Sequence, residues 1–290
     1  MRVAVAATVV LGASFMAYAS RAEDVPRADA LVVVTPQAAD SKQPLLGYLA
    51  RPDLPGRLPA VVVLHGCDGF HPNMPLWAAR LRSWGYVALA IDSLTPRHIR
   101  NGCSDHAGGI EEPVDALAAL RYLAALRFVD PTRIAVLGFS RGGGAALADV
   151  EKLGPAQYFP ASFRAAIAYY PDCSGISDGF QAPVLILAGN QDDWLPAQAC
   201  RDMDRQAAGK GAPISLVIYP GATHAFNVNA PPRIYLGHAL RYDPQATQDA
   251  EQRTHAFLHD MLADSNASMA HADMLRDRSA KGPEGGATTR

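Results

Sequence analysis

A serine flanked by glycines, in Gly138-Phe139-Ser140-Arg141-Gly142, is the first candidate for chemistry in this sequence. The motif follows the apolar run Ile134 to Leu137 and precedes a segment rich in glycine and alanine. A G-x-S-x-G sequence between a strand and a helix is typical of a nucleophile elbow, a sharp turn that exposes the serine hydroxyl. A glycine turn that cradles a phosphate is the alternative, but the spacing fits neither nucleotide-binding glycine motif. We therefore predict that Ser140 is a nucleophile in acyl transfer.

A serine hydroxyl is a poor nucleophile until a base takes its proton, and that base needs a carboxylate to orient it. In elbow-type hydrolases these partners follow the serine in the order acid, then histidine. Asp192 and Asp193 lie in the loop that follows the apolar run Val184 to Ala188, and His224 comes after the run Ile214 to Tyr219. The sequence predicts His224 as the base and leaves both aspartates as candidates for the acid.

The negative oxygen of the acyl-transfer transition state needs hydrogen-bond donors that are already in place. We expect one donor to be the backbone N–H of Arg141, the residue after the nucleophile. The second is expected from the glycine-rich segment His65-Gly66-Cys67-Asp68-Gly69, where we choose the N–H of Cys67. A tight glycine turn is the simpler interpretation of that segment and is compatible with this role.

The elements that position these residues alternate along the chain. Strands buried on both faces of a parallel sheet are typically short, continuous apolar runs, and helices cover the faces of such a sheet. We predict an α/β fold, with a mostly parallel sheet between helices, because strands and helices alternate. The predicted strands are Val61 to Leu64, Val87 to Ile91, Ile134 to Leu137, Ala165 to Tyr169, Val184 to Leu187 and Ile214 to Tyr219. The predicted helices are Pro75 to Trp84, Glu111 to Arg127, Gly143 to Lys152, Ala197 to Ala208 and Asp249 to Leu262, and Leu31 to Thr35 with Leu45 to Ala50 are expected to add an antiparallel edge hairpin.

The two ends of the chain differ from its middle. Arg2, the apolar run Val3 to Met16 and the small residues after it resemble a secretory signal peptide over residues 1–22. Residues 265–290 are small, polar and charged without an apolar period, which predicts a disordered tail. One catalytic domain is then expected over residues 23–264, periplasmic or secreted and without stable membrane insertion.

Export favours disulfides among the four cysteines, because the compartments outside the cytoplasm are oxidising. Cys67 and Cys103 follow neighbouring predicted strands, and Cys173 and Cys200 follow another adjacent pair, so we predict the bonds Cys67–Cys103 and Cys173–Cys200. Zinc is the alternative, but the chain contains no C-x-x-C spacing. A metal site at His98, Asp105 and His106 is likewise disfavoured against a solvated loop.

Composition excludes two broad classes of function. With 49% hydrophobic and 19% charged residues, the 290-residue chain can bury a core, which excludes global disorder. A formal net charge of -2 provides no basic field for a phosphate backbone, so nucleic acid is not expected as a partner.

Taken together, the motifs resemble the dienelactone hydrolase family of the α/β-hydrolase superfamily. The residues that carry the resemblance lie between Leu45 and Met261 and are His65 to Gly69, Gly85-Tyr86-Val87, Val129 to Ile134, Gly138 to Gly144, Asp192-Asp193-Trp194, Thr223 to Phe226 and Tyr242-Asp243-Pro244. The resemblance implies an α/β-hydrolase fold, a catalytic triad and no need for a metal or cofactor. The family pattern G-x-x-D-x-x-x-P fits Gly189, Asp192 and Pro196, and therefore selects Asp192 as the acid. The chain departs from the enzymes that name the family, which use cysteine where this chain has Ser140.

The sequence therefore predicts an exported serine hydrolase of small-molecule carboxylic esters or lactones, acting through an acyl-enzyme. The departure to serine makes ordinary esters at least as good a prediction as dienelactones. Phe139, Trp194 and Phe226 are expected to line the substrate pocket, as is Trp77, with the ordinary core as the alternative for each. Acyl transfer or peptide cleavage on the same triad is one alternative function, and a secreted binding protein on a hydrolase scaffold is another.

Overall fold

The computed structural model describes residues 29–34, 44–103, 112–176 and 178–263. The predicted signal peptide and the predicted tail lie outside these ranges, as do Asp105 and His106. The signal peptide and the disordered tail therefore remain predictions.

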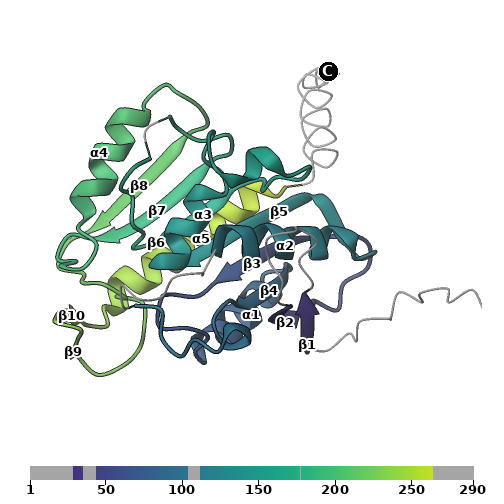
Figure 1. Cartoon of the computed structure of the whole chain (residues 1–290), viewed down its shortest axis with the longest axis horizontal. Coiled ribbons are helices and arrows are strands. Elements are labelled where there is room, and N and C mark those ends of the chain that lie inside the picture. The colour runs from purple at the N-terminus through teal and green to yellow at the C-terminus, as the bar shows by residue number, and fades with distance from the viewer. Residues whose placement is uncertain (1–28, 35–43, 104–111, 177, 264–290) are drawn as a thin grey trace, which may run out of the picture.

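Eight strands form one twisted central sheet (Figure 1). The spatial order is β1-β2-β4-β3-β5-β6-β7-β8, with β3 to β8 parallel and β1 and β2 running antiparallel at one edge. The strands are β1 (Ala30–Val34), β2 (Leu45–Ala50), β3 (Leu58–Leu64), β4 (Val87–Asp92), β5 (Val129–Phe139), β6 (Ala166–Tyr169), β7 (Val184–Gly189) and β8 (Ile214–Tyr219). The predicted α/β architecture and its edge hairpin are confirmed.

Helices cover both faces of the sheet, and each strand contributes side chains to both sides. In β3, Val62 and Leu64 enter one core cluster, while Val61 and Val63 enter the other, as the two-residue period of a strand requires. The helices α2 (Glu112–Ala125), α3 (Arg141–Ala148) and α4 (Ala197–Ala207) pack on the first cluster, and α1 (Asn73–Ser83) and α5 (Pro244–Met261) pack on the second.

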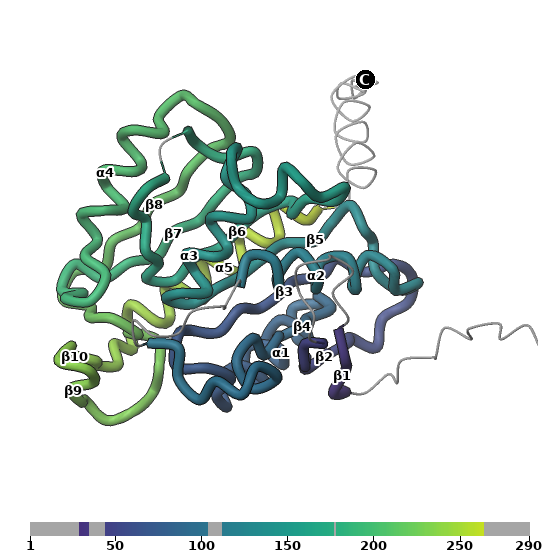
Figure 2. The backbone as a smooth tube through the Cα atoms, viewed as in Figure 1, coloured from purple at the N-terminus to yellow at the C-terminus, as the bar shows by residue number. Residues whose placement is uncertain are grey.

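Short elements complete the chain. Two 3-10 turns occur at Thr95–Arg97 and Pro155–Tyr158. A small hairpin of β9 (Arg233–Tyr235) and β10 (His238–Leu240) precedes α5 (Figure 2). Within the described part of the chain, no helix is both long and apolar enough to span a bilayer.

The structure moves the boundaries of two predicted helices. The last helix begins at Pro244 and not at Asp249, because the Asp243 carboxylate caps it by accepting the N–H groups of Gln245 and Ala246. The apolar period used for the prediction starts only at Ala250, inside this helix, and therefore missed the polar first turn. The helix after the elbow begins at Arg141, directly after Ser140, and ends four residues earlier than predicted.

Both predicted disulfides are present. Cys67 is bonded to Cys103 and Cys173 to Cys200, with Cα atoms 4.7 Å and 4.9 Å apart. Cys200 lies on α4, which follows β7, and β7 pairs with β6, the strand before Cys173. Each bond typically adds about 2–4 kcal/mol of stability.

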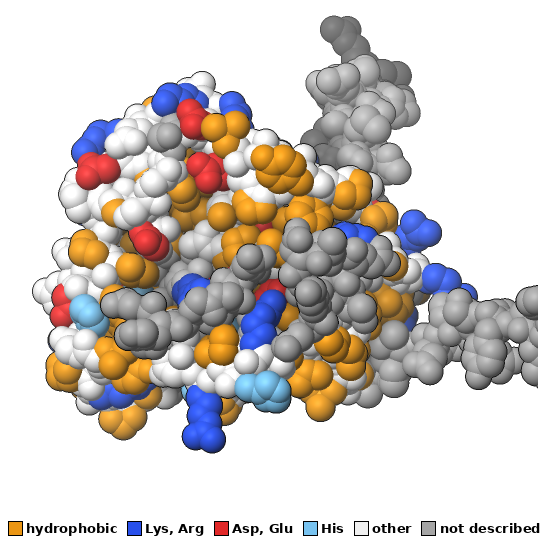
Figure 3. Space-filling model, in the orientation of Figure 1, with side chains coloured by type: hydrophobic (Ala, Val, Ile, Leu, Met, Phe, Trp, Pro, Cys, Tyr) orange, Lys and Arg blue, Asp and Glu red, His pale blue; other side chains and the backbone are white. Residues whose placement is uncertain are grey.

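The surface agrees with the small net charge of the sequence. On the face shown in Figure 3, basic and acidic side chains are interspersed with apolar ones.

Candidate active site

Ser140 occupies a sharp turn between β5 and α3. Its backbone angles, φ 52° and ψ -117°, lie where residues with a side chain are rarely found. The two glycines of the motif are needed because the backbone passes too close for a side chain. A Cβ added to Gly138 would lie 1.9 Å from the carbonyl oxygen of Gly142, and a Cβ added to Gly142 would lie 2.4 Å from the carbonyl oxygen of His65. The elbow therefore packs tightly against itself and against the segment after β3, and the serine carries the strained conformation.

Ser140, His224 and Asp192 form a continuous hydrogen-bonded series. His224 Nε2 lies 2.9 Å from Ser140 Oγ, and His224 Nδ1 lies 2.7 Å from Asp192 Oδ2. All three residues are buried. The residues come from the carboxyl ends of β5, β7 and β8, which meet at one edge of the parallel sheet.

The two neighbouring aspartates have different surroundings. Asp192 Oδ1 accepts the backbone N–H groups of Trp194 and Leu195 at 2.9 Å and 2.8 Å, which leaves Oδ2 directed at the histidine. Asp193 is exposed and lies 3.5 Å from His238 of β10. The geometry brings Asp192, and not Asp193, to His224.

Aromatic rings surround the histidine. Tyr170 packs edge-on against His224 with ring centroids 4.8 Å apart, and Trp194 lies at 5.1 Å. Of the predicted pocket residues, Trp194 is half-buried and keeps surface for a ligand. Phe139 and Phe226 have 2% and 0% of their surface exposed and, like Trp77, pack among core aromatic residues, because they sit on the strand and loop beneath the site. This packing favours the core interpretation for them.

The segment after β3 passes directly beside the serine. An added Cβ at Gly66 would lie 3.6 Å from Cβ of Ser140. Its first residue, His65, is buried and accepts the backbone N–H of Ser93 through Nε2 at 3.1 Å. An amide can only donate, so Nε2 carries no proton and the ring is neutral; burial also lowers the pKa of His65. His65 therefore holds this segment against the chain at Ser93 through a hydrogen bond, a role that the sequence did not indicate.

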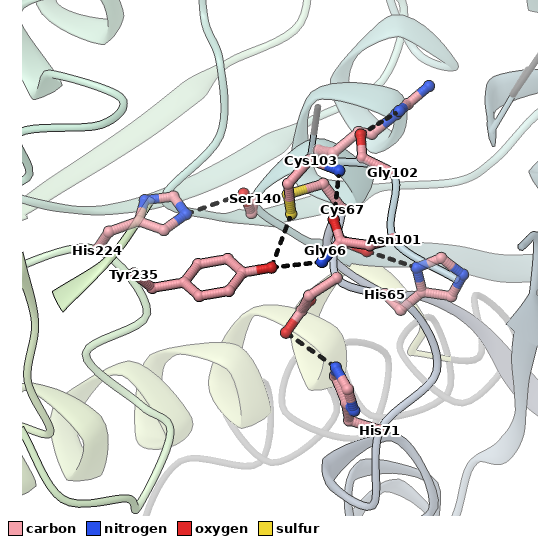
Figure 4. The surroundings of a disulfide bond; sticks show 12 residues. His65, Gly66, Cys67, His71, Asn101, Gly102, Cys103, Ser140, His224 and Tyr235 are labelled. Atoms are coloured by element: carbon pink, nitrogen blue, oxygen red, sulfur yellow. Dashed lines mark hydrogen bonds and ion pairs between the residues drawn. A yellow bond between two sulfur atoms is a disulfide. The ribbon is translucent and has the colours of Figure 1, made fainter. Parts of the chain in front are cut away.

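A second segment lies against the first through the disulfide (Figure 4). The Gly102 N–H donates to the Cys67 carbonyl at 2.7 Å. The Tyr235 hydroxyl of β9 reaches the Cys103 sulfur at 3.9 Å and accepts a hydrogen bond from Asn101. Trp194 stands next to Tyr235, with ring centroids 5.9 Å apart. The β9–β10 hairpin therefore borders the site, and no sequence motif pointed to Tyr235.

Glu112 is a buried acid that the sequence analysis also missed. It opens α2 with 2% of its surface exposed, and its carboxylate oxygens have no hydrogen-bond partner in the described residues. The Arg141 guanidinium lies nearby, with Nε 3.5 Å from Oε1. Burial raises the pKa of Glu112 to about 8, although the nearby Arg141 charge opposes the shift. Periodicity places Glu112 on a helix but does not reveal that its side chain points inward at the elbow.

The raised pKa makes stability depend on pH. Between the ordinary value of 4.5 and about 8, the folded protein holds a proton on Glu112 that the unfolded chain has lost, so this group lowers stability as pH rises. Glu112→Gln removes the titration. When the pH is raised from 5 to 8, we expect the wild type to lose about 3 kcal/mol of unfolding free energy that the variant does not lose.

Chemical denaturation at the two pH values measures this difference. The control is Asp260→Asn, at an exposed carboxylate near the end of α5, which is expected to keep the wild-type profile. Parallel pH profiles for the Glu112→Gln variant and the wild type would contradict the assignment of a raised pKa.

In the described residues, His, Cys, Asp and Glu side chains form no group of three that is placed to hold a metal ion.

Residues 45–262 match the model of the dienelactone hydrolase family. Among curated proteins, a Bradyrhizobium sp protein named "Probable 2-oxo-3-(5-oxofuran-2-ylidene)propanoate lactonase" is 31% identical over 199 residues, which is 63% of this chain and 79% of that protein.

Solved structures show the same fold. Thermogutta terrifontis esterase 2 phosphorylated by paraoxon has a TM-score of 0.63 and 22% identity, and the match covers 82% of this chain and 96% of that one. A dienelactone hydrolase-like promiscuous phosphotriesterase from metagenomic libraries has a TM-score of 0.61 and 21% identity, over 81% of this chain and 98% of that one.

Proposed function

The chain belongs to the dienelactone hydrolase family, and on that premise we propose that it is an exported serine hydrolase of small-molecule carboxylic esters or lactones. Membership of the family supports ester and lactone hydrolysis. The observation that carries the serine mechanism is the series of contacts from Ser140 Oγ through His224 to Asp192, at 2.9 Å and 2.7 Å. The two disulfides favour an oxidising compartment, which supports export.

The proposed reaction has two halves. Ser140 Oγ attacks the substrate carbonyl while His224 Nε2 takes its proton, and Asp192 stabilises the resulting imidazolium. His224 then gives the proton to the leaving oxygen, which leaves an acyl-enzyme on Ser140. For a lactone the leaving oxygen stays attached to the acyl group. Water, activated by the same imidazole, releases the acid and restores the serine.

The carbonyl oxygen becomes negative in each half and needs two donors. The Arg141 amide opens α3, where helix N–H groups point toward the serine. The Cys67 amide belongs to the segment that passes beside Ser140. We propose these two amides as the oxyanion hole and Trp194 as one wall of the pocket.

The test is hydrolysis by the mature protein with both disulfides intact. Short p-nitrophenyl acyl esters and an unsaturated five-membered enol lactone are expected to be turned over. Paraoxon should inactivate the enzyme progressively, and the added phosphoryl mass should appear on the peptide that contains Ser140. Failure to hydrolyse any ester or lactone, or inactivation with Ser140 unmodified, would contradict the proposal.

A further inference from the structure

One residue connects the two segments that carry the proposed oxyanion donors. The Gly102 N–H donates to the Cys67 carbonyl at 2.7 Å, and the Gly102 carbonyl accepts a hydrogen bond from the Arg141 guanidinium at 3.1 Å. Cys103, the next residue, is bonded to Cys67. The contacts therefore run in a continuous series from the Arg141 side chain to Gly102, and from Gly102 to the backbone of Cys67. Figure 4 shows Gly102 beside Cys67 and Cys103.

The Arg141 guanidinium is held from its other side as well. Its Nε lies 3.5 Å from Oε1 of Glu112, whose side chain is 3% exposed, whereas the Arg141 side chain is 31% exposed. The buried acid group at the start of α2 therefore lies against the cation that contacts Gly102, without a hydrogen bond to it in the described residues. Arginine suits this task because its planar guanidinium presents several donors in fixed directions.

This series has a consequence for catalysis. The elbow places the Arg141 amide, but the Cys67 amide belongs to a separate segment after β3. An oxyanion hole is effective only when both donors already lie within about 0.5 Å of the positions that bind the oxyanion. The Arg141 side chain links the elbow to the segment of Gly102 and Cys103. The Gly102 N–H and the disulfide then link that segment to Cys67.

We propose that the Arg141 side chain is a positioning group, which holds the Cys67 amide in the oxyanion hole through the Gly102 backbone. This inference rests on the proposed function. Arg141 would then act twice, with its amide as an oxyanion donor and with its guanidinium as the support of the other donor. The cation could instead bind an anionic group of the substrate directly, and the test distinguishes this use from the positioning role.

The experiment compares Arg141→Met and Arg141→Lys with the wild type on a neutral ester, p-nitrophenyl acetate, and an anionic one, p-nitrophenyl hemisuccinate. For the methionine variant we expect kcat to fall about 10- to 100-fold on both esters, less than for outright removal of a donor, because the donor is displaced and not deleted. KM should stay within about twofold. The lysine variant should recover part of kcat, since its ammonium can still donate to the Gly102 carbonyl.

A transition-state analogue provides a second readout that a general loss of stability would not reproduce. The affinity for a trifluoromethyl ketone, which forms an oxyanion on Ser140, should fall by the same factor as kcat/KM. The matched control is Arg133→Met, because Arg133 also donates to backbone carbonyls, those of Arg57 and Leu262 at 3.2 Å and 3.5 Å. That change is expected to lower the unfolding midpoint and to leave kcat unchanged.

The disulfide supplies an independent variant. In Cys67→Ala/Cys103→Ala, kcat should also fall, and adding Arg141→Met should cost less than the product of the separate losses, because both links position one segment. Unchanged kcat in a folded Arg141→Met variant overturns the proposal, and so does a rise in KM confined to the anionic ester. If the wild type hydrolyses neither these esters nor the enol lactone, the proposed function fails instead, which distinguishes the two.

Discussion

Ser140→Ala is expected to lower kcat for ester hydrolysis by about 10⁴- to 10⁶-fold, with KM almost unchanged. The hydroxyl is the atom that would form the acyl bond, and His224 Nε2 lies 2.9 Å from it. Fold stability should change little, since alanine keeps the Cβ that the strained turn already accommodates. The measurement is steady-state turnover of p-nitrophenyl esters, after the unfolding midpoints of the variant and the wild type have been shown to agree.

Ser140→Cys is the informative companion. The cysteines of the wild-type chain are all in disulfides, so iodoacetamide should react with this variant and leave the wild type unlabelled. The neighbouring imidazole favours the thiolate, so labelling should be faster than for a free cysteine. Residual turnover by Ser140→Ala close to that of the wild type would rule out this nucleophile.

Asp192→Asn is expected to lower kcat by about 10⁴-fold. An asparagine at this position loses the negative charge that stabilises the imidazolium, and it can present an N–H to His224 Nδ1 and so favour the wrong tautomer. The two backbone N–H groups that bind Oδ1 should still hold the amide in place, so the variant should fold. Turnover of the same esters measures the loss.

The neighbouring aspartate is the matched control, since the position after the strand left both residues open and only the family pattern selected Asp192. Asp193 contacts His238 and the backbone N–H of Ala239 on the β9–β10 hairpin, at 3.5 Å and 3.4 Å. Asp193→Asn should therefore keep kcat within about threefold of the wild type. Equal losses in the two variants would contradict the assignment of Asp192.

Much of the fold and the site was predictable because the relevant signals are local. Continuous apolar runs reported strands buried on both faces, and they gave the parallel sheet and the chain order of its strands. The carboxyl ends of parallel strands share one edge, so Ser140, the aspartates and His224 were expected to meet there. The same adjacency predicted Cys67 with Cys103 and Cys173 with Cys200.

The sequence by itself thus determined the fold class and the disulfide partners, and it predicted Ser140, Asp192 and His224 as the catalytic series. Only the tertiary structure placed Glu112 against Arg141, Tyr235 against Cys103, and Gly102 between Arg141 and Cys67. These contacts join residues on different loops and helix ends, and the path of a loop has no residue period that a sequence could display. Periodicity reports which face of its own element a residue occupies, whereas the partner across a loop is decided when the whole sheet is packed.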